Sequence, residues 1–535
     1  AVMVASMFTG CGSDNGSSSA KSASAASAAS AANDTVDEDG KVNGIMYQEG
    51  LPLVDEGDYT FSIFCDDSSE SGEFIMLDEF KKQTNVDVDL KIYPYETATE
   101  RLNLDLNSGD YADVIGGWTL SDNAILTYGV NQGVFIPLED YFEKYCPNIS
   151  AILDLPGVRE KMTAPDGHIY TIPYVCGDTT VGYSPYINTK WLENVGMSMP
   201  TTTDEFEAVL KAFKEQDANG NGDASDEIPF STDPNNKHIE AMAGYFGLPM
   251  NKLGIAIQDE KVVYGGVSNT YREFLSWFHK LYADGLVDVE LYTQDSSTWE
   301  GKGNQDLYGV SIAYGSNEFT GIPAAEERGD FDSMPVLNTD KDGIWLRDTE
   351  GFSVYRTQAV ITNKAEHPEI ICRWFDNAFA LENGIGCNRG PVGVIVNKED
   401  DGYHAIDTTT LSEEDQEKYS WGNLWPQSLP KYLPVDFEFV EEHPMYDEKK
   451  ATEEAYEANL TKEIIPSYWI DLDKIDTFSD TNTAIKDFFE QQQAQFVCGE
   501  LDIDNDADWQ AYVDGMYSLG LEDWVATQGI EEIAK

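Results

Sequence analysis

The chain has 535 residues, of which 41% are hydrophobic and 12% aromatic. This length exceeds what one compact core usually holds, so we expect two lobes or domains. Acidic side chains number 97 against 34 basic ones, and the net charge of -63 repels nucleic-acid phosphates and anionic lipid headgroups. Nucleic acid is therefore excluded as a partner.

The N-terminal region is predicted to be an exported, lipid-anchored tether. Residues 1–10 form an apolar run that ends in small residues, like the remnant of a secretory signal peptide. The segment Phe8-Thr9-Gly10-Cys11 resembles the bacterial lipobox, so Cys11 is the expected lipidation site. From Gly12 to about Asn33 the residues are almost wholly Ser, Ala, Gly, Asp and Asn, which cannot bury enough apolar surface to fold. We expect the protein to be held by its lipid at the extracellular face of the cytoplasmic membrane.

The six remaining cysteines form no C-x-x-C pair, so neither a zinc site nor a thioredoxin-like redox motif is indicated. An exported location permits disulfides, but the sequence selects no pairing. We expect buried free thiols at Cys65, Cys146, Cys176, Cys372, Cys387 and Cys498.

The first elements after the tether alternate between strands and helices. Residues 59–64 and 86–92 alternate apolar and polar side chains, and residues 74–80 between them carry apolar side chains at helical spacing. A short helix ends near Gly109, and a further buried strand begins at Val114. This order predicts a parallel, doubly wound α/β sheet, in which ligands bind at the carboxyl ends of the strands.

Three longer helices are predicted farther along the chain. Thr202 and Glu205 have the spacing of a capping box at the start of the first helix. Residues 271–281 present an aromatic face at helical spacing, and Pro368 begins the third helix. Trp374 falls on the apolar face of that third helix, so we expect it in the core.

A loop that follows the first of these helices has the pattern of a calcium site. Oxygen-bearing side chains alternate around glycines, which suits a hard cation that takes six to eight oxygen ligands. Ile228 stands where the bidentate glutamate of a full EF-hand would be, so the loop is a shortened relative, and an empty Asn-Gly turn is the alternative. The predicted structural Ca²⁺ ligands are Asp217, Asn219, Asn221, Asp223, Asp226 and Glu227. A second run lacks the required glycine and is expected to begin the last helix, at Asp502, Asp504, Asp506 and Asp508.

Several motifs occur in a characteristic order along most of the folded chain. They include Asn107-Ser-Gly-Asp-Tyr-Ala-Asp-Val-Ile115, Asp166-Gly-His-Ile-Tyr-Thr-Ile-Pro173, Ile187-Asn-Thr-Lys-Trp-Leu192, Pro200-Thr-Thr-Thr-Asp-Glu-Phe206, Leu281-Tyr-Ala-Asp-Gly-Leu286, Ile361-Thr-Asn-Lys364 and Asp508-Trp-Gln-Ala-Tyr-Val513. Together they resemble the family 1 extracellular solute-binding proteins of carbohydrate ABC importers. A calcium loop similar to residues 217–227 occurs in oligosaccharide-binding members of that family.

The resemblance implies a two-lobed periplasmic-binding-protein-like fold of type II, with the ligand cleft between lobes that close by a hinge motion. The chain is expected to cross between lobes near Pro173 and to return near Gly351. The implied organisation is a signal remnant at 1–10, a linker at 11–54, lobe 1 at 55–172 and 351–395, and lobe 2 at 173–350 and 396–535.

Candidate ligand residues follow from what a sugar requires. Sugars stack their C–H faces on aromatic rings, and their hydroxyls bond to carboxylates and amides. Asp66, Asp67 and Trp118 follow strand ends at the rim of the first sheet. The other candidates are Tyr183, Trp299, Asn317 and Glu318, and an irregular Gly- and Pro-containing stretch with Trp421 and Trp425.

The predicted function is capture of an oligosaccharide and its delivery, by a monomer, to the permease subunits of an ABC transporter. Two other classes remain open. A secreted glycoside hydrolase would also need aromatic platforms and a carboxylate pair, and a surface adhesion protein would hold glycans without transport. We expect no enzymatic activity, because the chain contains no H-E-x-x-H, P-loop or G-x-S-x-G motif.

Overall fold

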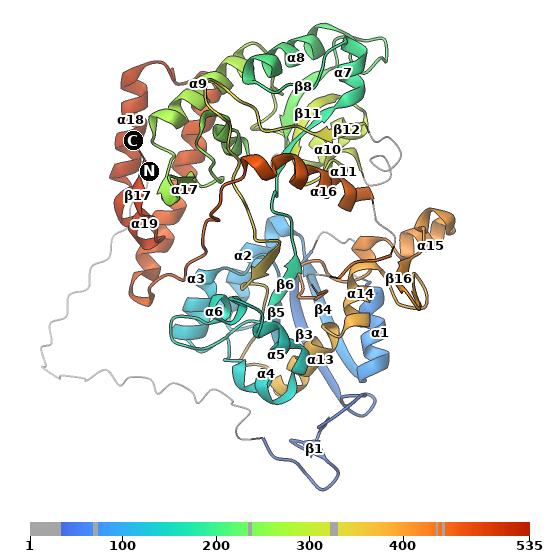
Figure 1. Ribbon diagram of the computed structural model, residues 1–535. Helices are drawn as coiled ribbons and strands as arrows, with labels where there is room; N and C mark the ends of the chain where they lie inside the picture. The colour runs from blue at the N-terminus through green and yellow to red at the C-terminus, as the bar shows by residue number, and fades with distance from the viewer. Residues whose placement is uncertain are drawn as a thin grey trace, which may run out of the picture.

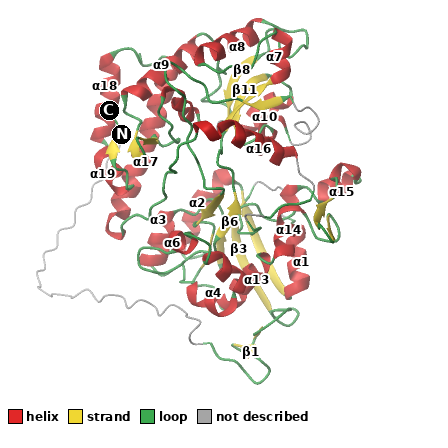
Figure 2. Ribbon diagram, viewed as in Figure 1, coloured by secondary structure: helices red, strands yellow, loops and turns green. Residues whose placement is uncertain are grey.

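The chain folds into two lobes, which Figure 1 shows one above the other, joined by extended segments. Both lobes combine a sheet with surrounding helices (Figure 2), which confirms the predicted two-lobed α/β fold. The computed structural model describes residues 34–67, 73–233, 238–321, 330–434, 437–440 and 444–534. Cys11 and nearly all of the Ser/Ala-rich segment lie outside these residues. Within the described ranges, no helix is long and apolar enough to cross a membrane.

The sheet of lobe 1 contains the strands predicted from the alternating pattern. β3 runs parallel to both β4 and β5, while β14 is antiparallel to β5. Because β14 comes from a distant part of the chain, the sheet is mixed at one edge. The strands lie in the order β14 (Ala359–Ile361), β5 (Val114–Gly116), β3 (Tyr59–Asp66) and β4 (Val86–Tyr93).

Both faces of this sheet are buried, as a doubly wound sheet requires. Ile63 and Val114 pack with one set of helices, whereas their neighbours Phe64 and Ile115 pack with another. The first set comprises α1 (Ile75–Thr84), α4 (Glu139–Tyr145), α5 (Pro147–Leu153), α6 (Val158–Met162) and α13 (Pro368–Ala378). The second comprises α2 (Tyr95–Ser108) and η2 (Ile125–Asn131), which follows α3 (Asp122–Ala124).

Lobe 2 contains a second four-stranded sheet. β11 runs parallel to β8 and antiparallel to β7, which in turn is antiparallel to β12. The order is β12 (Phe331–Ser333), β7 (Ser184–Asn188), β11 (Tyr308–Ala313) and β8 (Ile228–Thr232). The helices and turns around it are α7 (Thr189–Val195), α8 (Thr203–Glu215), η3 (Ile239–Phe246), α10 (Ser296–Asn304), α11 (Asn317–Thr320) and α16 (Pro444–Tyr456).

The predicted capping box at the start of α8 is present in a shifted form. The Thr202 hydroxyl accepts the Glu205 N–H at 3.2 Å, as expected of an N-cap. The Glu205 carboxylate accepts the N–H and the hydroxyl of the preceding Thr201, at 2.9 and 2.8 Å. The helix start is therefore fixed by both threonines.

A helical layer completes lobe 2 beside a small sheet. Asp506 and Asp508 lie in the first turn of α18, where their charges favour the helix, but α18 is followed by one more helix. The predicted aromatic face of α9 packs into the main core of this lobe. The layer comprises α9 (Asn269–Ala283), α17 (Ile475–Cys498), α18 (Asp506–Ser518), α19 (Leu521–Thr527), β9 (Ile255–Gln258), β10 (Lys261–Tyr264) and β17 (Glu532–Ile533).

Two antiparallel strands carry the chain between the lobes. β6 (Tyr174–Gly177) pairs with β13 (Phe352–Tyr355) over all four of its residues. Val175 lies in the core of lobe 1 and Val181 in the core of lobe 2, so the chain crosses between these residues. It returns after Trp345, a core residue of lobe 2. The predicted crossing points, near Pro173 and Gly351, adjoin this strand pair.

Three segments pack elsewhere than the predicted boundaries place them. Val42 and Val54, assigned to the linker, lie in the core of lobe 1. Trp425 and Leu429, assigned to lobe 2, lie in that same core. Trp469, also assigned to lobe 2, packs against lobe 1 before α17 re-enters lobe 2. The remaining elements are β1 (Lys41–Val42), β2 (Met46–Tyr47), α14 (Leu381–Arg389), β15 (Val396–Glu399), β16 (Gly402–Ala405), η4 (Thr408–Thr410), α15 (Glu413–Lys418), η5 (Trp421–Asn423), η6 (Glu457–Asn459) and η7 (Leu472–Lys474).

The described cysteines are free, as expected, but they are not all buried. Cys176 is half-buried and Cys498 is exposed. Burial raises the pKa of the Cys176 thiol to about 12, so this thiol stays protonated at neutral pH.

Candidate functional site

An exposed tryptophan lies where the lobe 1 sheet meets the strand pair that joins the lobes. Trp118 follows β5, and 46% of its surface is exposed. Its ring packs edge-on against Tyr355 of β13, with centroids 5.3 Å apart, and lies 6.3 Å from Tyr174 of β6. Tyr174 and Tyr355 stack on one another at 5.4 Å. These three rings form an aromatic platform with one free face on Trp118.

Asp66 positions this platform and does not face solvent. It is fully buried at the end of β3, and its carboxylate accepts the N–H groups of Trp118 at 3.0 Å and Thr119 at 2.7 Å. Burial raises the pKa of Asp66, and these hydrogen bonds oppose that rise. Gly117, directly before Trp118, has a φ of 137°, and a Cβ at this position would lie 2.3 Å from the Asp66 carboxylate. Asp66 is therefore a support of the Trp118 loop.

Asp67 fixes a second exposed tryptophan through the segment 421–431. Its carboxylate accepts the N–H of Gln427 at 2.7 Å, and the Gln427 side-chain amide donates to the carbonyl of Trp421 at 2.9 Å. The Trp421 side chain remains 53% exposed, with the Lys431 ammonium 5.4 Å from its ring centroid. Lys431 is itself buried and donates to Gln427 at 2.7 Å; burial lowers its pKa to about 8.

Lobe 2 presents tyrosines toward the same strand pair. Tyr183 stacks on His238, with centroids 4.0 Å apart and planes 14° apart, and meets Tyr314 edge-on at 6.0 Å. Burial lowers the pKa of His238 to about 4, so the stacked imidazole is neutral at pH 7. Asp178, which follows β6, accepts the Tyr314 hydroxyl at 3.1 Å and the Ser353 hydroxyl at 2.5 Å. Through Asp178 the lobe 2 tyrosines are tied to both connecting strands.

An ionic cluster around the buried Lys449 lies directly behind Tyr314. The Lys449 ammonium sits 3.6 Å from the centre of the Tyr314 ring and donates to the carbonyl of Gly182 at 3.0 Å. Asp348 accepts the Gly182 N–H at 2.7 Å, and Glu318 accepts the Tyr314 N–H at 2.9 Å. Burial raises the pKa of Glu318 to about 7 and lowers that of Lys449 to about 8.

Two of the predicted stacking residues have no free ring face. Trp425 is fully buried in lobe 1, stacked on Trp374 at 5.7 Å and packed on Phe80 at 5.2 Å. Trp299 is buried on the other sheet, where its indole N–H donates to Ser311 at 3.2 Å. The prediction that Trp425 and Trp299 contact ligand disagrees with the structure, because both indole rings are buried in the core. Asn317 lies half-buried at the start of α11, next to Glu318.

The predicted calcium loop folds around its own side chains between α8 and β8. Asp217 accepts the Gly222 N–H at 3.0 Å, Asn221 accepts the Asp223 N–H at 2.8 Å, and Asp226 accepts the Asn221 amide at 2.7 Å. Asn219 accepts the Asn221 N–H at 3.0 Å. One oxygen of Asp217 and one of Glu227 are buried without a hydrogen-bond partner. Two unpartnered carboxylate oxygens in one small loop fit a bound cation.

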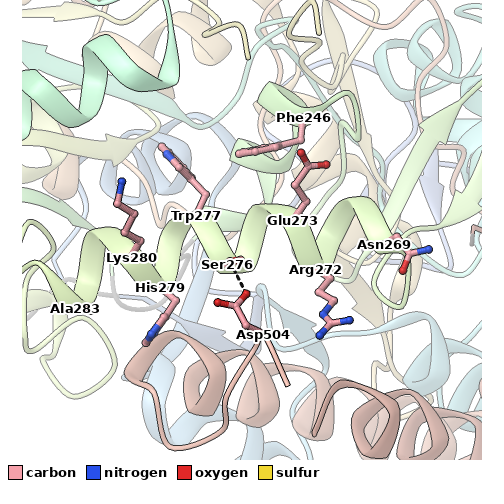
Figure 3. A pocket seen from close by; sticks show the side chains of 10 residues that line it. All are labelled: Phe246, Asn269, Arg272, Glu273, Ser276, Trp277, His279, Lys280, Ala283 and Asp504. Carbon is pink, nitrogen blue, oxygen red and sulfur yellow. Dashed lines mark hydrogen bonds between the residues drawn. The ribbon is translucent and has the colours of Figure 1, made fainter. Parts of the chain in front are cut away.

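A surface hollow of about 730 Å³ runs along α9, but its side chains do not converge. Figure 3 shows Glu273, Trp277 and Lys280 on one side of the helix and Arg272 and His279 on the other. The dashed line in the figure is the 2.9 Å hydrogen bond from Ser276 to Asp504, which joins α9 to the loop before α18. This hollow follows a helix packing groove and carries none of the predicted ligand residues.

Comparison with known proteins identifies the family. The family of bacterial extracellular solute-binding proteins matches residues 67–384, which is more than half of the chain. The chain belongs to this family. The match covers β4, β5 and β14 of the lobe 1 sheet, the connecting strands and most of lobe 2, and it confirms the resemblance seen in the motifs.

Two curated relatives of this solute-binding protein align over part of their length. The fructooligosaccharide ABC transporter substrate-binding protein FusA of Streptococcus pneumoniae is 33% identical over 335 residues, which is 61% of either chain. Lipoprotein LipO of Bacillus subtilis is 28% identical over 280 residues, covering 50% of this chain and 52% of LipO. The chain thus spans less than two thirds of either relative.

The fold itself is shared over nearly the full length of a solved structure. FusA of S. pneumoniae, described as an EF-hand mutant in complex with fructo-nystose, superposes with a TM-score of 0.75 at 27% identity. The superposition covers 88% of this chain and 98% of that one. Two lobes with this connectivity are therefore the common architecture.

We call the region where the Trp118 platform and the lobe 2 tyrosines, Tyr183 and Tyr314, meet strands β6 and β13 the junction. Several of its residues were not predicted from the sequence. Tyr174 and Tyr355 belong to segments recognised only as crossing points, and Tyr314 and Lys449 meet although they are far apart in the chain. Asp178 belongs to none of the motifs recognised in the sequence. The one available signal was a tyrosine beside each predicted crossing, Tyr174 next to Pro173 and Tyr355 near Gly351, which marked the place but not the contacts.

Proposed function

We propose that this protein is the substrate-binding component of an ABC importer, which captures an oligosaccharide between its lobes and passes it to the permease subunits. The observation that carries the proposal is the exposed ring of Trp118 next to the connecting strands, with the Tyr183 and Tyr314 rings of lobe 2 beside the same strands. Aromatic faces joined by hydrogen-bonding carboxylates are what a sugar needs. The names of FusA and its sugar-bound structure support the same class of ligand.

The connecting strands give the proposal a mechanism. Among the described residues, β6, β13 and the later crossing segments join the lobes, so a rotation about them would change the distance between the Trp118 platform and lobe 2. A ligand that contacts both lobes binds the closed form more tightly, and this difference in affinity drives closure. The closed form is the one that the permease would accept.

A glycoside hydrolase remains a second candidate, because Glu318 has a pKa raised to about 7 by burial, as a general acid requires. Against it, the Glu318 carboxylate already accepts a backbone N–H and lies beside Lys449. A binding role explains these contacts without a reaction. Adhesion without transport shares the same site and differs only in the partner.

The deciding experiment is calorimetric titration of a panel of tri- to pentasaccharides, followed by an assay of reducing ends in the same samples. We expect saturable binding of at least one glycan with no increase in reducing ends over hours. Release of reducing ends would establish the hydrolase, and failure of every glycan to bind would contradict the proposal. Deletion of neighbouring permease genes should abolish uptake of the bound sugar, which an adhesion protein would not affect.

We further propose that the loop 217–227 binds a structural Ca²⁺. The buried, unpartnered oxygens of Asp217 and Glu227 would be ligands, together with oxygens of Asn219, Asn221, Asp223 and Asp226. The EF-hand named for the FusA structure supports the same kind of site. The ion would stabilise the connection between α8 and β8 and would not contact the sugar.

Calcium removal provides the test. Addition of EDTA should lower the melting temperature, because an ion present at 100 times its Kd stabilises the fold by about 2.7 kcal/mol. Asp217→Asn should abolish the EDTA effect, while Asp259→Asn, in an exposed turn elsewhere in lobe 2, should leave it intact. An unchanged melting temperature with EDTA, and no calcium by metal analysis, would overturn the proposal.

The proposed location is the extracellular face of the cytoplasmic membrane, with the lipid on Cys11 and the protein acting as a monomer. The lipobox-like segment before Cys11 and the relative named lipoprotein LipO support this location. Cells that express Cys11→Ala should release the protein into the medium, whereas wild type should fractionate with membranes. Equal release of both would contradict the anchor.

A further inference from the structure

The lobe 2 side of the junction is strongly acidic. The charges of Glu318 and Asp233 contribute to a raised pKa of Tyr183. The charge of Asp178 has the same effect on Tyr314 and Tyr355. These carboxylates also act on one another: Asp233 and Glu300 both raise the pKa of Glu318. The carboxylates linked in this way are Asp178, Asp233, Glu300, Glu318, Asp348 and Glu448.

The positive charge of the lysine within this cluster is already balanced by carboxylates. Lys449 is buried in α16, where its ammonium donates to the Gly182 carbonyl and lies on the Tyr314 ring. Four carboxylates act on it, namely Glu318, Glu448, Asp178 and Asp348. A ligand carboxylate would have to compete with all of them for one ammonium whose donor and ring contacts are in place.

Among the described residues, three further cations border the junction, and each has other interactions. Arg356 follows β13 and forms a fork with Asp122, while its guanidinium lies 4.1 Å from the Trp469 ring centroid. Lys431 is buried and bonded to Gln427. Lys252 is exposed and helps to lower the pKa of His238.

From this arrangement we infer that the site, if it binds oligosaccharides as proposed above, selects neutral chains and rejects chains of uronic acids. Neutral sugars offer hydroxyl donors, which carboxylates accept in charge-assisted hydrogen bonds. A uronate brings a second anion against Glu318 and its neighbours and must give up its own hydration. Stacking on Trp118 serves both classes equally, so charge decides between them.

A matched titration tests the inference. Calorimetry is run at pH 7.5 with neutral oligosaccharides (kestose, galactotriose, xylotriose, mannotriose and maltotriose) and with trimers of galacturonate, mannuronate and guluronate. We expect the tightest neutral ligand to bind at least about 30-fold more tightly than the tightest uronate, because like charges in contact are strongly unfavourable.

The outcomes separate this inference from the proposed function. A uronate that binds as tightly as, or more tightly than, the best neutral glycan overturns the charge selection and leaves the binding function standing. If no glycan of either class binds, the proposed function fails and the selection fails with it. Neutral-only binding supports both.

Glu318→Gln locates the selection. It removes one negative charge beside Tyr314, so the ratio of uronate affinity to neutral affinity should rise by about 5- to 10-fold. Glu260→Gln, which removes an equal charge from an exposed ion pair with Lys462, should leave that ratio unchanged. Methyl-esterified trigalacturonate should bind more tightly than the free acid to wild type, and this difference in affinity should shrink by the same factor of about 5 to 10 in the variant. An unchanged ratio in Glu318→Gln would overturn the assignment to this acidic cluster.

Discussion

The two sides of the junction differ in which groups are exposed and where their charges lie. On the lobe 1 side, Trp118 and Trp421 are exposed, and buried carboxylates, Asp66 and Asp67, hold their loops through backbone N–H groups. On the lobe 2 side, Tyr314 is half-buried, and Glu318 and the other charged groups lie close behind it. The difference supports the proposed division of roles, in which lobe 1 would supply a surface for stacking and lobe 2 the charge that selects among sugars.

The largest effect is expected from removing the Asp66 carboxylate, which holds the Trp118 loop of lobe 1. Asp66→Ala leaves the Trp118 and Thr119 N–H groups without their acceptor and opens space in the core, which should cost about 2–4 kcal/mol of unfolding free energy. Urea denaturation followed by tryptophan fluorescence measures this cost. Asp89→Asn, on the exposed side of β4, is the control and should change stability by less than about 0.5 kcal/mol. Equal stability of both variants would contradict the supporting role of Asp66.

The next effect separates stacking from folding. Trp118→Ala should weaken sugar binding by about 10- to 100-fold, as expected for a central aromatic contact, with little loss of stability because the ring is half exposed. Calorimetric titration and thermal melting measure the two quantities in parallel. Tyr517→Ala, which removes an exposed ring from α18, should leave binding unchanged. Wild-type affinity in the Trp118 variant would place the ligand elsewhere.

The smallest effect concerns the ionic cluster of lobe 2. The pKa of Glu318, raised to about 7 from an ordinary value of 4.5, means that the folded protein holds a proton that the unfolded chain has lost between these pH values. This group therefore makes stability fall as pH rises from about 5 to 7. Wild type should lose stability relative to Glu318→Gln across that range, on the order of 1–2 kcal/mol after solvent screening. Parallel pH profiles for the two proteins would contradict the raised pKa.

Local patterns in the sequence predicted the supporting framework better than the site. The strands before Asp66 and Trp118, and the helix after Thr202, follow from periodicity and capping, which act over a few residues. The rim position of Trp118 followed from the same rule. Tryptophan placement beyond that rule could not be predicted, because Trp425 is buried by Phe80 and Trp374, which lie far away in the chain.

The charge of lobe 2 was hidden for a similar reason. With 97 acidic side chains, no pair of carboxylates stands out in the sequence. The cluster forms because α16 carries Lys449 onto Tyr314, more than a hundred positions earlier in the chain. Only Glu318 of this cluster was predicted, and it was expected to contact ligand without its buried partners.

Binding as proposed here requires one oligosaccharide to contact both sides of the junction at once. Small-angle X-ray scattering of the protein with and without a saturating concentration of its tightest neutral ligand tests this claim most directly. We expect a smaller radius of gyration with ligand, because contacts to Trp118 and to lobe 2 together would draw the lobes closed. An unchanged radius of gyration at proven saturation would contradict it.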